Sequence, residues 1–138
     1  MSGAPTGTRG SADVPEPGGF HPRELPDGGI EFLLDDPVLT GIVIQDRVTL
    51  RFGATDVVLA DPFDLEVDGV GYHLDPKRPD TLGPLLAVYP GTARWLHASP
   101  GGELVLVLMQ GQRLVVPGPA VRLAWVVGPA DAARPVDG

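Results

Sequence analysis

The acidic segment from Asp64 to Asp75 comes closest to a chemical motif. A calcium loop needs oxygen ligands at its first, third and fifth positions, glycine at the sixth and a carboxylate at the twelfth. Asp64, Glu66, Asp68, Gly69 and Asp75 occupy those positions. Prolines on both sides exclude the flanking helices that such a loop requires. The alternation of apolar and acidic residues instead predicts a strand whose carboxylates face water.

The three histidines, His21, His73 and His97, lie far apart in the sequence. A metal site would need two of them, or one with carboxylates, to converge. Only His73 has acids nearby, Asp68 and Asp75, and such a group is typical of an ordinary surface cluster. We therefore expect no metal ion and no cofactor.

Nucleophiles are scarce in this chain. It contains no cysteine, which excludes disulfides, thiolate catalysis and Cys-ligated metals. The three serines, Ser2, Ser11 and Ser99, lie outside any G-x-S-x-G elbow. Gly101-Gly102 lacks the lysine and the glycine spacing of a phosphate loop. Acids are plentiful, but no pair stands out for acid–base chemistry, so we predict no catalytic residues.

Composition indicates one small acidic domain. A chain of 138 residues has room for one hydrophobic core, and 43% apolar residues exclude a wholly disordered chain. Nineteen glycines and 16 prolines favour short elements over long helices. The net charge of −8 argues against nucleic acid and against an anionic membrane surface. Without a signal peptide or a membrane span, a cytoplasmic location is expected.

The distribution of apolar and turn-forming residues predicts a disordered leader (1–28), a single β domain (29–129) and a disordered tail (130–138). Short apolar runs between turn residues predict the strands. They are 40–44, 48–52, 57–60, 63–67, 71–74, 93–98, 104–109, 113–116 and 123–127, with 30–34 as an additional edge strand. One short helix is predicted after Pro79, with Asp80 or Thr81 as its cap and Pro90 as its stop.

The strands before and after this helix look alike. Residues 48–53 match 106–111, and 57–59 match 114–116, although two Val/Leu hairpins can also resemble each other by chance. The predicted fold is mainly β: two similar antiparallel β-meanders, packed as a sandwich or partly open barrel, with one short helix between them.

Several separate motifs, in the same order, resemble a family of small uncharacterised actinobacterial proteins over about residues 38–129. They are Val48-Thr49-Leu50-Arg51-Phe52-Gly53, Asp61-Pro62-Phe63, Leu74-Asp75-Pro76, Leu82-Gly83-Pro84-Leu85-Leu86 and Ala124-Trp125-Val126-Val127-Gly128-Pro129. The resemblance implies a single domain in a bacterial cytosol. It implies no activity.

Charge is unevenly distributed along the sequence. Residues 31–80 carry eleven acids and four basic residues, whereas residues 81–129 carry one acid and three arginines. We therefore expect a non-enzymatic interaction module, immunity-like or regulatory, whose acidic face binds a basic protein partner. A homodimer is the other partner considered. The candidate acidic face consists of Asp61, Asp64, Glu66, Asp68 and Asp75.

The alternative is a small-molecule-binding β-barrel, or a cofactor-free enzyme of the cyclase or isomerase type. Its site would be an apolar interior pocket with one or two polar groups. The candidate pocket residues are Tyr72, His73, Tyr89, Trp95, His97 and Trp125. In the interaction module, by contrast, both tryptophans are expected in the core.

Overall fold

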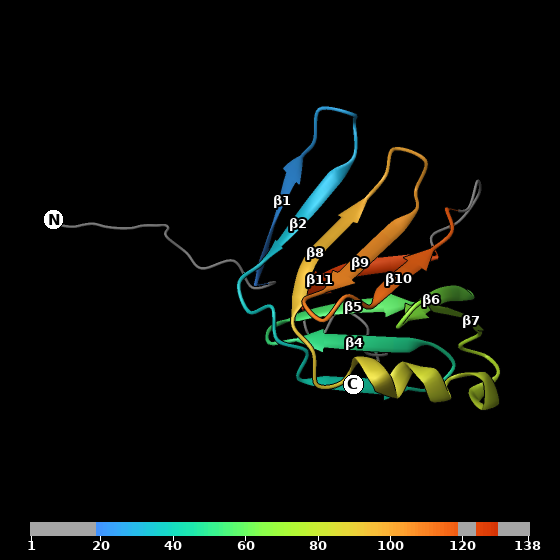
Figure 1. The fold of residues 1–138 in the computed structure, drawn as a ribbon. Helices are drawn as coiled ribbons and strands as arrows, with labels where there is room; N and C mark the ends of the chain where they lie inside the picture. Colours follow the sequence, from blue (N-terminus) through green and yellow to red (C-terminus); the bar gives the residue numbers. More distant parts are fainter. Residues whose placement is uncertain (1–18, 119–123, 130–138) are drawn as a thin grey trace, which may run out of the picture.

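The computed structural model describes residues 19–118 and 124–129, and all its strand pairs are antiparallel (Figure 1). One sheet has seven strands in the order β1-β2-β8-β9-β10-β6-β7, and the other has four in the order β11-β5-β4-β3. Neither order closes on itself within the described ranges. The prediction of a mainly β chain with antiparallel sheets is confirmed, and a closed barrel is excluded for this part.

The seven-stranded sheet combines two hairpins, β1–β2 and β6–β7, with the three-stranded meander β8–β9–β10. Its strands are β1 (Phe20–Glu24), β2 (Ile30–Leu34), β6 (Phe63–Val67), β7 (Val70–Leu74), β8 (Ala93–Ala98), β9 (Leu104–Leu108) and β10 (Arg113–Val116). The four-stranded sheet contains β3 (Gly41–Ile44), β4 (Val48–Phe52), β5 (Thr55–Leu59) and β11 (Trp125–Pro129). In Figure 1 the strands of the two sheets cross at a steep angle.

One apolar core lies between the sheets. β4 contributes Val48, Leu50 and Phe52, each at most 1% exposed, because alternate side chains of a strand point to the same face. β6 contributes Phe63 and Leu65 in the same way, while its intervening acids are exposed. Leucine and valine fill most of this space, as the low aromatic content requires.

The predicted helix is present as two short 3-10 segments, η1 (Pro79–Thr81) and η2 (Gly83–Val88). Proline stands in the first turn of each, and a proline farther inside an α-helix would clash with the preceding turn. Neither segment has a side-chain cap, so the predicted capping role of Asp80 or Thr81 is wrong. Leu85 and Val88 of η2 are buried in the core.

The folded part begins earlier than the predicted boundary at residue 29. β1 lies inside the predicted leader and pairs with β2 along its whole length. β2, predicted as an edge strand, therefore lies between β1 and β8. The remainder of the predicted leader (1–18) and the predicted tail (130–138) lie outside the described residues.

The two hairpins whose sequences match lie in different sheets. β4–β5 belongs to the four-stranded sheet, and β9–β10 belongs to the seven-stranded sheet. Each is a two-strand antiparallel unit with a glycine of positive φ in its turn, Gly53 in one and Gly111 in the other. An internal repeat remains a prediction.

One ion pair holds the β4–β5 hairpin. Asp56 is 1% exposed and accepts two hydrogen bonds from Arg51, Nε at 2.8 Å and Nη2 at 3.1 Å. The two residues are cross-strand partners. Such a two-point contact fixes the guanidinium and satisfies both oxygens of a carboxylate that has left water.

Replacing Asp56 should therefore destabilise the fold. Asp56→Ala removes both bonds to the half-buried Arg51 guanidinium and should lower the free energy of unfolding by about 3 kcal/mol. Asp80→Ala is the matched control, because Asp80 pairs with Arg78 at 3.7 Å on the exposed surface and should cost little. Urea unfolding of the two variants measures the difference, and equal losses would contradict it.

Candidate functional site

The outer face of the seven-stranded sheet consists of the side chains that alternate with core residues on its strands. Cross-strand register arranges these side chains in two rows. One row contains Arg23, Glu31, His97, Val105, Val115, Asp64 and His73. The other contains His21 and Leu33 on β1–β2, then Trp95, Val107, Arg113, Glu66 and Gly71. An apolar centre thus lies between charged ends.

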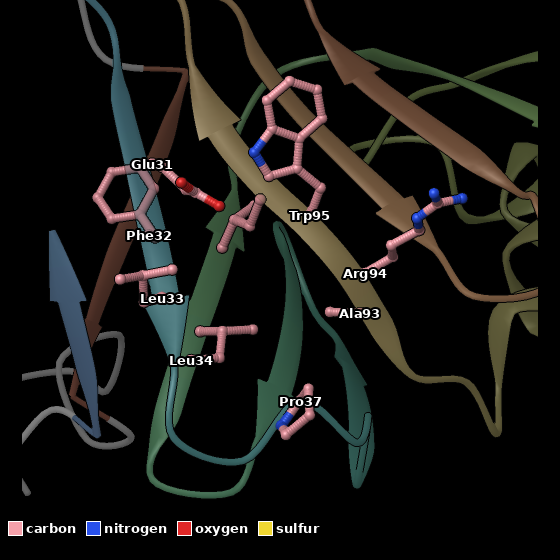
Figure 2. Close-up of a pocket in the computed structure, with 9 residues that line it drawn as sticks. Glu31, Phe32, Leu33, Leu34, Pro37, Ala93, Arg94 and Trp95 are labelled. Atoms are coloured by element: carbon pink, nitrogen blue, oxygen red, sulfur yellow. The ribbon is translucent and has the colours of Figure 1, made fainter. Parts of the chain in front are cut away.

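A gap interrupts this face between β2 and β8. The two strands pair only at Ile30 with Ala98 and at Glu31 with His97, and the chains meet again at a bridge between Val38 and Thr92. A pocket of about 170 Å³ lies between these points (Figure 2). Its lining is Glu31, Phe32, Leu33, Leu34, Pro37, Ala93, Arg94, Trp95 and Leu96.

Trp95 directly follows a bulge in β8, where the register with β9 shifts between Ala93 and Trp95. It shares the outer face with His97, because side chains two residues apart in a strand point to the same side. Leu96 and Ala98 point into the core, whereas Trp95 is 42% exposed on the outer face. Its indole stacks on the His97 ring, with centroids 3.8 Å apart and planes at 24°. The expectation that Trp95 belongs to the core is wrong.

Charges surround this aromatic pair. Arg23 donates a hydrogen bond from Nη2 to Oε1 of Glu31, which lies directly opposite His97. Burial lowers the pKa of His97 from its ordinary value. The carboxylates of Asp27, Glu31 and Glu103 act in the opposite direction, and Arg113 lowers the pKa further. His97 is therefore neutral at pH 7 and offers an uncharged ring to its neighbours.

The five acids proposed for an acidic face all lie on the β6–β7 hairpin or directly next to it. Asp64 and Glu66 are exposed on the outer face, and Asp68 lies in the turn with a φ of 52°. Asp61 and Asp75 lie at the opposite end of the hairpin, before β6 and after β7. Asp75 accepts a hydrogen bond from the backbone N–H of Lys77 at 3.0 Å, so it shapes a turn.

The six candidate pocket residues do not form one site. Trp95 and His97 are together, but Tyr72 and His73 lie on β7 at the sheet edge. His73 contacts Asp64 across the hairpin, Nδ1 to Oδ1 at 2.8 Å, rather than the acids closest to it in sequence. Trp125 packs against the core and donates from Nε1 to the Gly102 carbonyl at 2.7 Å.

Tyr89 lies in a different place. With Leu86, Gly41 and Ile42 it lines an open pocket of about 300 Å³ beside β3. Leu86 is 66% exposed and Tyr89 is 49% exposed. This pocket contains no charged group.

A cluster of buried apolar side chains lies between the sheets, and both pockets described above open at the surface. Among residues 19–118 and 124–129, no cluster of three or more His, Asp or Glu side chains could hold a metal ion. In the same residues, no helix is long and apolar enough to cross a membrane.

Sequence reasoning missed Glu31 and Leu33 as members of the site. Their strand was predicted, but its neighbour β8 could not be inferred because residues 30–34 and 93–98 are distant in sequence. One signal was available. Glu31 and Leu33 alternate with Phe32 and Leu34, which places the carboxylate and one leucine on a common face.

His97 should make stability depend on pH. Because folding lowers its pKa, the unfolded chain binds more protons as the pH falls through about 6.5. The contribution of His97 to folding is complete above that pH and decreases below it, until the pH passes the pKa in the folded state. His97→Gln should therefore show a smaller fall in unfolding free energy between about pH 7 and pH 5 than the wild type. Urea unfolding at each pH measures this difference. If the unfolding free energies of the two proteins change with pH in parallel, His97 is not the group responsible.

Comparison with known proteins gives one match. Neither the curated proteins nor the solved structures contain a match to this chain. The model of a protein family, described as "Family of unknown function (DUF6188)", matches residues 31–134. That range covers both sheets except β1 and Ile30, the first residue of β2, and the chain therefore belongs to this family of unknown function.

Proposed function

We propose that this protein is a non-enzymatic interaction module, and that the outer face of its seven-stranded sheet binds a protein partner with a basic surface. The observation that supports this most is the exposure of that face. Asp64, Glu66 and Trp95 all present exposed side chains on it. A broad face with an apolar centre and a charged rim is typical of protein interfaces.

The acidic end of the outer face, which carries Asp64 and Glu66, is suited to electrostatic steering of a partner. Asp64 and Glu66 lie one strand away from Arg113, so this end combines two carboxylates with one guanidinium and His73. Such charges change the association rate of a complementary partner more than its final affinity. An immunity-like or regulatory role in an actinobacterial cytoplasm is the specific form of this proposal.

Neutralising the acidic end tests it. Purified wild-type protein and the double variant Asp64→Asn/Glu66→Gln are immobilised and exposed to host lysate at low and high salt. A basic protein should be retained by the wild type at low salt, and less of it by the double variant. With that protein purified, its association rate should fall about tenfold in the variant at low salt and much less at high salt.

The matched control is Asp46→Asn/Asp80→Asn. It removes the same charge from two exposed acids outside the outer face. If both double variants slow association equally, net charge alone is responsible and the outer face is not the docking surface. A lysate that yields no basic partner at any salt concentration would also count against the proposal.

A second copy of the chain is the other partner that we propose, through a different surface. β3 is an edge of the four-stranded sheet, and its sequence Gly-Ile-Val-Ile has neither charge nor proline. Val43 and Ile44 are 39% and 41% exposed. Edge strands without such protection pair readily with another strand, and an antiparallel pair of β3 strands is self-complementary.

Val43→Lys should therefore prevent dimerisation. The lysine keeps β3 intact but places a charge on its exposed face, a device that natural edge strands use. Sedimentation velocity should show concentration-dependent dimers for the wild type and monomers for the variant. Val70→Lys, on β7 at an edge of the seven-stranded sheet, should still dimerise. A monomeric wild type, or loss of the dimer in Val70→Lys alone, would contradict a β3 interface.

A further inference from the structure

Two features of the outer face meet at Trp95. The indole lines the pocket in the β2–β8 gap, and it also stacks on His97. We propose that this gap is a socket for one cationic side chain, arginine or lysine, of the basic protein partner. The proposal rests on the proposed function and specifies its central contact.

The aromatic ring provides the first reason. A cation is attracted to the face of an indole more strongly than to any other side-chain ring. Trp95 is held in place by its stack, yet it keeps 42% of its surface exposed. Preorganised and exposed aromatic rings are also common at the centres of protein interfaces.

The charges around the ring provide the second reason. Asp27, Glu31 and Glu103 all raise the pKa of His97, whereas Arg113 lowers it. His97 itself is neutral at pH 7, because burial lowers its pKa. Three carboxylates thus act on His97 against one guanidinium, a balance that complements a basic side chain and disfavours an acidic one.

Glu31 provides an acceptor at the pocket. Arg23 bonds to one of its two oxygens, Oε1, and an ionised carboxylate can accept donors at both. The Glu31 side chain is only 15% exposed, whereas that of Arg23 is 61% exposed. Figure 2 shows Glu31 extending from β2 toward β8, with the Arg94 guanidinium directed away from it. A second guanidinium or an ammonium group can thus bind at Oε2.

The walls of the pocket suit the rest of such a side chain. Leu33, Leu34 and Pro37 line it, and the methylene stems of lysine and arginine pack along apolar surface while their charged ends stay near water. The volume of about 170 Å³ is below the range of about 300–1,000 Å³ typical of small-molecule sites. One side chain fits this space better than a metabolite.

The test uses tryptophan fluorescence in a Trp125→Phe background, where Trp95 is the sole tryptophan. The probe is N-acetyl-arginine methylamide, and the comparison is the citrulline compound, which has a similar shape but no charge. We expect saturable binding of the arginine probe in the millimolar range. The citrulline probe should bind about fivefold more weakly, because it lacks the attraction to the ring and to Glu31.

Two variants show which groups are responsible. Glu31→Gln should abolish most of the preference for arginine over citrulline, and Trp95→Ala should abolish binding, measured in this variant by backbone amide shifts along β8. Asp80→Asn is the matched control, because it makes the same charge change at an exposed acid outside the outer face. It should leave both affinities unchanged, and unchanged amide spectra elsewhere show that each variant is folded.

Equal binding of arginine and citrulline, or equal effects of Glu31→Gln and Asp80→Asn, would overturn the socket. These outcomes are separate from those of the partner experiment. If a basic partner depends on Asp64 and Glu66 while the arginine probe fails, the interaction module stands and the socket is wrong. If the probe binds at Trp95 but no basic partner exists, the socket is a cation site and the proposed function is wrong.

Discussion

Burial of two apolar sheet faces against each other is the constraint on which the rest of this structure depends. The four-stranded sheet is narrower than the seven-stranded one, so it cannot cover that sheet completely. Three aromatic rings extend the core toward the uncovered side. Phe32 makes edge-to-face contacts with Phe20 and Trp125, each with centroids 6.0 Å apart. Because Phe32 packs on this inner side, its neighbours Glu31 and Leu33 must point outward.

The gap beside Trp95 follows from the same constraint. β2 places Phe32 in the aromatic cluster, whereas β8 must keep Leu96 and Ala98 in the core. β8 pairs with β2 only as far as Glu31 and His97, and it carries a bulge between Ala93 and Trp95 farther along the gap. A bulge beside a pocket is a common arrangement near functional sites, because the irregular backbone ends regular strand pairing at that point.

Local pattern predicted the strands well, and long-range pairing accounts for the errors. Ranges 48–52, 63–67, 93–98 and 113–116 coincide with observed strands. The first two alternate strictly between apolar and polar residues, and the other two are mostly apolar. β1 carries His21, Pro22 and Arg23 and has no such alternation, so only its pairing with β2 makes it a strand. The exposure of Trp95 was also unpredictable from size and hydrophobicity, because Leu96 and Ala98 occupy the core side of β8.

Strand order also changes the meaning of the uneven charge along the sequence. The acids of β6 belong to the acidic first half, yet their neighbour across the sheet is β10, whose Arg113 belongs to the basic second half. The two halves are therefore interleaved in space, and the net charge of −8 acts on a partner mainly from a distance. At contact, within a Debye length of about 8–10 Å, individual side chains dominate. Recognition must then depend on local groups such as Glu31 and Trp95, while the remaining acids increase the rate of encounter.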